Sequence, residues 1–443
     1  MHGLGLIWSV PFILTLLAIA LGPLFLKEIW EKHSFKILLI FPAILGVGMT
    51  MNYSFGFFLT ESINSILHHY VPLISLLFAL FTVTGGIYIS VNKAATPLLN
   101  TAMLFISSLL AGWIGTTGAA MLFIRPLLNI NKDRKNVTHI VIFFIFLVAN
   151  IGGGFTPIGD PPLLMGFIEG VDFFWTLKHI GLIVLTTIVV LCTIFYLIDN
   201  YLIKKENFEK SSWNGDVKKN IFKIDGFFNI FCLTFIIFCV IISGIVSKGE
   251  VSAFGIKFDL CALSRDLILV IIGVISLKFS SKEIRKLNAF SFSPLKEVAE
   301  IFIAIFITLI PVAYMLQEGS AGAFVCLFDW ASDINALNPL RCFFATGLLS
   351  SFLDNAPTYL IFFNLGGGNA NILMNELSVT LSAISIGAVF FGAMTYIGNA
   401  PNFMVRSIAV ERGIRMPSFF GYMGWSMGIL LPYFFLLSYI CFN

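Results

Sequence analysis

Two aspartates, Asp160 and Asp354, lie inside long apolar segments, far from the ends of any predicted membrane span. A carboxylate in the apolar part of a bilayer costs free energy, so each is a functional candidate. Each also precedes an expected helix start, where it could act only as an N-cap, a role that Asn355 and Asn399 suit equally. One carboxylate that binds H+ and Na+ in turn would be the simplest device for antiport.

Hydroxyl and amide side chains accompany these acids in the sequence. Their oxygen atoms, like those of carboxylates, are the ligands that hard cations prefer. Each of them could instead make only a hydrogen bond between helices. The candidate ion-binding residues are Asp160, Asp354, Asn355, Thr116, Thr117, Thr156, Thr358, Thr395, Asn399, Asn402 and Asn150; the sodium candidates among them are Asp160, Asp354, Thr116, Asn355 and Asn399.

An internal repeat relates these residues. The segment 156–162 matches the segment 395–401 at four of seven positions, at a spacing of 239 residues. The same spacing places Gly115-Thr116-Thr117 on Asp354-Asn355-Ala356. One match would be weak, but two separate matches at one spacing indicate a duplicated unit.

Glycine and proline inside the two matching segments cannot continue a regular helix. We therefore expect two discontinuous spans, whose half-helices restart near Pro161 and Pro401. Two re-entrant hairpins should restart similarly, near Thr117 and Pro357. The four half-helix N-termini would then meet near the membrane midplane, where they would also form a good anion receptor.

The composition requires a membrane protein. Of the 443 residues, 58% are apolar and 12% are charged, against about 25% charged in a soluble domain. This excludes a soluble enzyme, a disordered chain and a disulfide scaffold, and a net charge of +3 is too small to indicate a nucleic-acid partner. The seven cysteines lack metal-ligand spacing, and neither a cofactor nor a catalytic residue is predicted. The first apolar run lacks the features of a signal peptide and should be retained.

The expected fold is an all-α polytopic membrane protein with about ten spans and two re-entrant hairpins. It consists of a first repeat at 1–203, a cytoplasmic linker at 204–225 and an inverted second repeat at 226–443. The expected spans are 4–26, 37–58, 68–91, 137–168 (broken), 177–202, 226–246, 264–278, 298–316, 377–405 (broken) and 417–440, with hairpins at 98–131 and 338–366.

The positions of the basic residues predict which side of the membrane each loop occupies. Most of the 27 Lys and Arg residues fall in segments that the map places in the cytoplasm, which satisfies the positive-inside rule. Both termini then lie outside, and the first hairpin opens to the cytoplasm and the second to the outside. Five crossings per half invert the second repeat, a transporter design. Arg125 and Arg406 should reach the cytoplasmic surface, and His68-His69 should be interfacial.

Three motifs resemble the ion transporter superfamily: ANIGGGFTPIGDPP at 149–162, LDNAPT at 353–358 and TYIGNAPN at 395–402. This group includes NhaD-type sodium/proton antiporters, citrate transporters, arsenite permeases and divalent-anion/sodium symporters. The likeness extends over essentially the whole chain, because both hairpins and both broken spans match in order.

The resemblance implies a scaffold domain, a transport domain that moves like an elevator, a homodimer and a bacterial inner membrane. By position, the resemblance also implies that sodium is bound by Thr116, Thr117, Asp160, Asp354, Asn355, Thr395 and Asn399. Dicarboxylate symporters have Ser-Asn-Thr at both hairpin tips, and this chain does not. At the position of Asp160, the dicarboxylate symporters have a threonine pattern, whereas the sodium/proton antiporters have an acid, as this chain does. Both departures favour cation exchange.

The first hypothesis is therefore a Na+/H+ antiporter with Asp160 and Asp354 at the cation and proton site. The alternative is Na+- or H+-coupled uptake of citrate or another di- or tricarboxylate, bound near Thr117 and Pro401. An intramembrane protease is excluded, since Gly-x-Gly-Asp and His-Glu-x-x-His are absent, and an ATP-driven pump is excluded because the chain lacks a Walker A motif.

Overall fold

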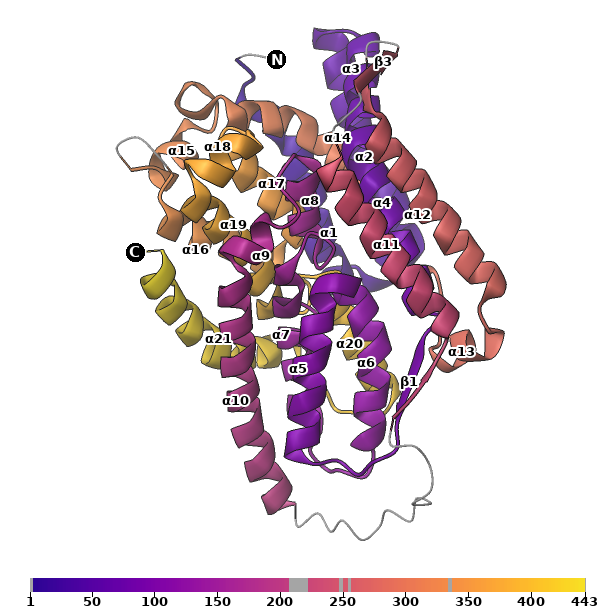
Figure 1. The fold of residues 1–443 in the computed structure, drawn as a ribbon. Helices are drawn as coiled ribbons and strands as arrows, with labels where there is room; N and C mark the ends of the chain where they lie inside the picture. Colours follow the sequence, from indigo (N-terminus) through magenta and orange to yellow (C-terminus); the bar gives the residue numbers. More distant parts are fainter. Residues whose placement is uncertain (1–2, 207–221, 247–249, 254–255, 334–336, 443) are drawn as a thin grey trace.

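The computed structural model describes residues 3–206, 222–246, 250–253, 256–333 and 337–442, and most of these are helical (Figure 1). Within the described residues, nine helical segments are long and apolar enough to cross a membrane. Two shorter apolar helices, Leu6–Gly22 and Ser378–Met394, occupy further positions where spans are expected. The protein is an all-α polytopic membrane protein, as its composition predicts.

The first half of the chain contains two 3-10 helices, η1 and η3, and one π-helical segment, η2. Its elements are η1 (Leu6–Ser9), α1 (Val10–Phe25), α2 (Lys27–Asn52), α3 (Phe55–Ser65), η2 (Ile66–Tyr70), α4 (Val71–Thr84), β1 (Tyr88–Val91), α5 (Pro97–Ile114), α6 (Thr116–Ile130), α7 (Thr138–Leu147), η3 (Ile151–Phe155), α8 (Pro161–Ile168), α9 (Trp175–His179) and α10 (Gly181–Lys205).

The second half begins with a strand that pairs back onto the first half. Its elements are β2 (Phe222–Asp225), α11 (Phe227–Ile245), β3 (Glu250–Ala253), β4 (Ile256–Asp259), α12 (Leu260–Phe279), α13 (Lys282–Leu287), α14 (Ser293–Gln317), η5 (Gly319–Ala321), α15 (Val325–Ala331), α16 (Pro339–Phe352), α17 (Asn355–Leu365), α18 (Ala370–Asn375), α19 (Ser378–Phe391), η6 (Gly392–Met394), α20 (Ala400–Glu411) and α21 (Phe419–Cys441).

Two antiparallel strand pairs lie at opposite ends of the molecule (Figure 1). β1 pairs with β2, with Tyr88 opposite Asp225, and β3 pairs with β4. We call the end that carries β1 and β2 the linker end, and the opposite end the β3 end. The hairpin of α5 and α6 lies toward the linker end, whereas α16 and α17 lie toward the β3 end (Figure 1).

For description we divide the helices into two groups, which contact each other where α14 packs against α17 and α4 against α6. In the scaffold group, α4 packs against α11 and α12, and α14 packs against α1 and α2. In the site group, α5 packs against α6, α10 and η3, α16 packs against α19, and α17 packs against α8. The core lies in the site group: 94% of the segment Thr138–Phe155 is buried, against 28% of α11 or α21.

The helix interruptions fall where glycine and proline predict them. α7 ends at Leu147, and helix resumes at Pro161, the first residue of α8. Its counterpart α20 resumes one residue before Pro401. The hairpin tips restart at Thr116 and Asn355, one and two residues before the expected positions, and Gly115 turns the first tip with a φ of 80°.

Matching hydrogen bonds brace the two hairpins against the two interrupted segments. The Thr156 hydroxyl donates to the Gly112 carbonyl at 2.5 Å, and the Thr395 hydroxyl donates to the Ser351 carbonyl at 2.5 Å. Both donors and both acceptors are separated by 239 residues, the spacing of the sequence repeat. The repeated motif therefore recurs as repeated local geometry.

The expected spans 37–58 and 68–91 differ from the observed helices. α2 ends at Asn52, and Ser54 starts α3 by accepting a hydrogen bond from the Phe57 amide at 3.1 Å. Helix then continues from Phe55 to Thr84. The hydropathy pattern did not predict the break between α2 and α3, because the short polar interruption there carries no charge.

Residues 88–91, expected at the end of a membrane helix, form β1 instead. Their partner strand β2 lies at the end of the expected linker 204–225, and residues 207–221 of that linker lie outside the described residues. Apolar composition could not distinguish the two structures, because Tyr, Ile and Val favour strands as well as buried helices.

We predict that Gly159→Ala destabilises the protein. A Cβ atom at Gly159 would lie 2.2 Å from the Gly153 carbonyl oxygen, a backbone atom that cannot rotate away. Overpacking of this kind costs about 1–3 kcal/mol, which thermal unfolding in detergent would detect as a lower midpoint. The matched control is Gly424→Ala in α21, where an added Cβ meets no atom within 4 Å. Equal stability of the two variants would contradict the close packing.

Candidate functional site

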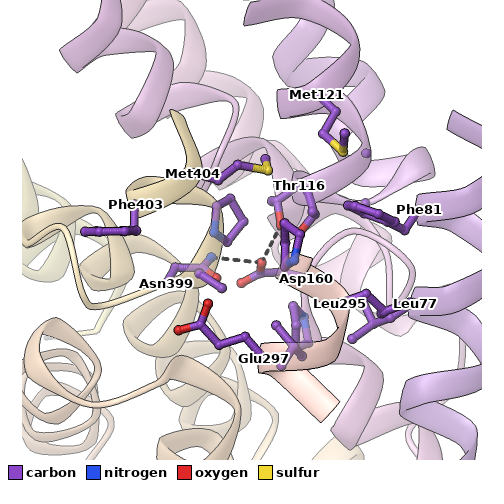
Figure 2. A pocket seen from close by; sticks show the side chains of 18 of the residues that line it. Leu77, Phe81, Thr116, Met121, Asp160, Leu295, Glu297, Asn399, Phe403 and Met404 are labelled. Carbon is purple, nitrogen blue, oxygen red and sulfur yellow. Dashed lines mark hydrogen bonds between the residues drawn. The ribbon is translucent and has the colours of Figure 1, made fainter. Parts of the chain in front are cut away.

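Asp160 lies at the centre of the molecule, with 1% of its surface exposed. Its Oδ1 atom accepts hydrogen bonds from the Thr116 hydroxyl at 3.0 Å and the Asn399 amide at 3.2 Å. Its Oδ2 atom accepts from the Asn355 amide at 2.5 Å. Figure 2 shows the bonds from Thr116 and Asn399 converging on the carboxylate. We call these four residues the Asp160 cluster.

Each member of the Asp160 cluster comes from a different interruption of the helices. Thr116 begins α6 and Asn355 begins α17, at the two hairpin tips, whereas Asp160 and Asn399 directly precede α8 and α20. The cluster thus consists of two pairs at the repeat spacing, Thr116 with Asn355 and Asp160 with Asn399. The tertiary fold brings together four of the five predicted sodium candidates, and the fifth, Asp354, is not bonded to the cluster.

The acids and amides that precede the half-helices differ in role: some side chains cap the helix that follows, and others face the Asp160 cluster. Asp160 and Asn399 have extended backbones, but neither side chain caps the helix that follows. Both side chains are therefore free to face the cluster. Asp354 does cap its helix, because its carboxylate accepts a hydrogen bond from the Ala356 amide at 3.2 Å.

A network of asparagines ties the two interrupted segments together beneath the cluster. The Asn150 amide donates to the Asn402 side-chain oxygen at 2.7 Å, and Asn402 donates to the carbonyls of Gly392 and Thr395. The Asn399 amide also reaches the Asn150 side-chain oxygen at 3.2 Å. Asn150 and Asn402 therefore hold the site residues in place and do not contact the Asp160 carboxylate directly.

The predicted threonines have different surroundings. Thr156 and Thr395 donate to hairpin carbonyls, as described above, and Thr358 donates to the Asp354 carbonyl at 3.0 Å. The Thr156 and Thr395 hydroxyls thus join separate helical segments, the alternative role that the sequence left open, whereas the Thr358 hydroxyl bonds within the first turn of its own helix. Thr117 instead lines a cavity together with Thr116.

This cavity, the site cavity, has a volume of about 590 Å³ and lies between the scaffold group and the Asp160 cluster (Figure 2). Asp160, Asp354 and Asn399 line it, and so do the hairpin-tip residues Thr116 and Thr117. Its lining continues to exposed residues of the linker end, among them Ser291 and Glu411. The cluster is therefore accessible from the linker end.

The hydrogen bonds around Asp160 suit an ionised carboxylate, because all three partners are donors. A hard cation could use an Asp160 oxygen, the Thr116 hydroxyl and the side-chain oxygen of Asn355, which has no hydrogen-bond partner within the described residues. No group of three or more His, Cys, Asp or Glu side chains in the described part of the chain could hold a metal ion.

A second cavity of about 380 Å³ lies at the other end of the contact between the groups. Its lining joins η2, α14, α8 and α17. Two polar bridges cross it: His69 Nε2 lies 2.7 Å from the Glu169 carboxylate, and the Gln317 amide donates to Asn364 at 2.6 Å. The histidine expected at the membrane interface thus connects the scaffold group to the site group.

One comparison with known proteins decides the family. A family model described as "Putative citrate transport" matches residues 1–442. The chain belongs to this citrate transport family. No curated protein matches the sequence. The expected likeness to citrate transporters is confirmed, whereas the NhaD subtype stays a prediction.

Four charged side chains that line the site cavity were not predicted from the sequence: Arg125, Glu297, Arg406 and Glu411. Arg125 and Arg406 line the cavity, although a position at the surface was expected. Glu297 reaches the cavity from α14, just before the expected span 298–316 (Figure 2). A helical spacing was available as a signal, because Thr117, Met121 and Arg125 follow one another at four-residue intervals on one face.

We predict that Asp160→Asn destabilises the protein and that Asn355→Asp in the same chain restores stability. In the single variant, an NH2 group replaces one carboxylate oxygen, so that a donor at residue 160 faces a donor of the cluster. Each unsatisfied buried donor costs about 1–3 kcal/mol. In the double variant, residue 160 donates to residue 355, so that the 2.5 Å bond is reversed and its partners again match.

Thermal unfolding of the purified protein measures both changes. Asp329→Asn is the control, because Asp329 is an exposed carboxylate outside the site. An Asp160→Asn protein as stable as the parent would show that the three donors do not require a carboxylate.

Proposed function

We propose that the protein is a secondary transporter that moves citrate, or another di- or tricarboxylate, together with Na+ or H+. Membership of the citrate transport family is the observation that carries this proposal. The site cavity supports it, since about 590 Å³ falls within the range of about 300–1,000 Å³ of small-molecule sites. A bare cation needs far less space. The N-termini of α6 and α20 at the deep end of the cavity favour an anion.

The Asp160 cluster would couple the carboxylate to a cation. A substrate with two or three negative charges is repelled by an ionised Asp160, so a proton or Na+ at Asp160 favours substrate binding in the same cavity. Rotation of the Asn355 amide would present its unpartnered oxygen to Na+. Asp354, which lines the cavity and caps α17, is available as a second acid.

Alternating access would use the two cavities. The site cavity reaches the cluster from the linker end, while the His69–Glu169 and Gln317–Asn364 bridges lie across the contact between the groups at the β3 end. In the opposite state the site group shifts along the scaffold group, the bridges break and the second cavity opens. This movement is of the elevator type, with the π-helical segment η2 as part of the bridge.

The Na+/H+ antiport hypothesis remains the second candidate. The observation that favours it is the presence of Asp354 in the same cavity as the buried Asp160. The positive-inside distribution of Lys and Arg supports a proposed orientation with the linker end in the cytoplasm and both termini outside. A homodimer in a bacterial inner membrane is the assembly that we propose for either function.

Transport assays in proteoliposomes separate the two functions. We expect labelled citrate, succinate or malate to accumulate when a Na+ or proton gradient is imposed, and Asp160→Asn to reduce accumulation at least tenfold because the coupling carboxylate is lost. If Na+ or Li+ alone dissipates an imposed pH gradient with an acidic lumen, and no carboxylate is taken up, citrate transport is overturned and antiport is favoured. The Asp329→Asn protein serves as the control for protein insertion.

The bridges at the β3 end lead to a separate prediction. Leu360 lines the second cavity and is buried, so a cysteine at this position should react slowly with a membrane-impermeant thiol reagent. Glu169→Ala in the same chain should accelerate labelling about tenfold, because a hydrogen bond to a charged group contributes about 1.5–3 kcal/mol.

The matched control is Glu376→Ala, which removes an exposed acid outside the second cavity. Cys326 should be replaced by serine first, since it is exposed. Equal labelling rates in the Glu169 and Glu376 variants would show that the His69–Glu169 bridge does not hold the second cavity closed.

A further inference from the structure

We propose that Arg125 and Arg406 bind the carboxylate groups of the substrate in the site cavity, between the linker end and the Asp160 cluster. This inference rests on the proposed transport of di- or tricarboxylates. It assigns a role in substrate selection to two side chains that the sequence places only at the membrane surface.

Arg125 is a buried cation that forms no ion pair with a described residue. It is 9% exposed, it lines the site cavity, and its Nη1 atom is buried without a hydrogen-bond partner. Glu411 lines the same cavity, but no carboxylate of the described residues lies within 4.0 Å of the Arg125 guanidinium. An isolated buried charge is costly, so a ligand anion is the partner that would offset the cost.

Arg406 presents a second guanidinium to the same cavity. Its central carbon lies 5.0 Å from the centre of the Tyr396 ring, and its Nε atom is buried without a hydrogen-bond partner. Stacking on an aromatic ring orients a guanidinium and leaves its edge available for a carboxylate. Within the described residues, Arg406 also has no carboxylate within 4.0 Å.

Other buried arginines of the protein have ion-pair partners. Arg134 forms an ion pair with Asp199 and lies 3.5 Å from Glu206, and Arg265 pairs with Asp266 at 2.7 Å. Arg285, which is half-buried and outside the cavity, donates instead to the carbonyl oxygens of Thr82 and Ser276, whereas the two buried arginines outside the cavity have counter-ions. Their absence at Arg125 and Arg406, the two arginines that line the site cavity, points to an external anion.

The two arginines follow a path toward the cluster. α6 and α20 pack against each other, and each begins at the Asp160 cluster. Arg406 lies six residues beyond Ala400, which is about 9 Å along the helix, and Arg125 lies nine residues beyond Thr116, about 13 Å along. A substrate entering from the linker end would therefore meet Arg125 first and Arg406 next, before it reaches the helix N-termini.

This arrangement predicts the chemical class of the ligand. A guanidinium binds a carboxylate through two parallel hydrogen bonds, and two guanidinium groups at successive depths suit an anion with two or more carboxylates. Monocarboxylates and chloride could engage only one of them. The paired arginines would thus select di- and tricarboxylates over smaller anions.

Transport kinetics in proteoliposomes test the inference. We expect Arg125→Gln and Arg406→Gln each to raise KM for citrate at least tenfold, with a smaller change in kcat, because the Asp160 cluster is intact. Arg125→Lys should recover part of the loss. Arg415→Gln is the matched control, since it removes an exposed arginine that lies toward the linker end but outside the cavity. An unchanged KM in both glutamine variants would overturn the inference.

Binding to the purified protein distinguishes this inference from the proposed function. Citrate should raise the unfolding temperature of the parent and of Arg415→Gln, but not of Arg125→Gln at the same concentration. Citrate stabilisation of the parent but not of Arg125→Gln, without citrate transport, would reject the proposed function and support the arginine site. Transport by the parent with equal citrate stabilisation of Arg125→Gln would support the function and reject the arginine site. Absence of both transport and stabilisation in the parent would reject both.

Discussion

The hydrogen bonds on the Asp160 carboxylate are the interaction around which the site is organised. A carboxylate at this depth requires donors from protein, because lipid supplies none. Thr116, Asn355 and Asn399 supply them from three separate interruptions of the helices. The interruptions and the charge thus depend on each other: the breaks bring the donors to one point, and the donors make the charge tolerable there.

The repeat supplies a symmetric framework with asymmetric chemistry. Thr156 and Thr395 brace the two hairpins in the same way, through bonds of 2.5 Å to backbone carbonyls. At the cluster the repeats differ, since Asp160 corresponds to Asn399 and Thr116 to Asn355. Backbone packing tolerates little change, whereas side chains that face the centre can diverge. One repeat therefore carries the charge and the other supplies amide donors.

The contact between the two helix groups is also asymmetric along its length. At the linker end it contains the larger cavity, with exposed lining residues and two arginines. At the β3 end it contains a smaller cavity crossed by polar bridges. Each bridge joins the scaffold group to the site group by a contact that a shift of several ångströms would break. Water could satisfy the partners of such polar contacts if they separated, as the proposed movement requires.

The sequence by itself determined the membrane class, the repeat spacing and the places where the helices break, because hydropathy, glycine and proline act locally. It also singled out Asp160 and the donors that surround it. Only the tertiary structure decided which candidates meet: Asp354 caps its helix, whereas Asp160 does not. It likewise placed Arg125 in a cavity, and paired His69 with Glu169 across 100 residues. The physical reason is that the direction of a side chain, and the presence or absence of its counter-ion, depend on helices distant in the chain.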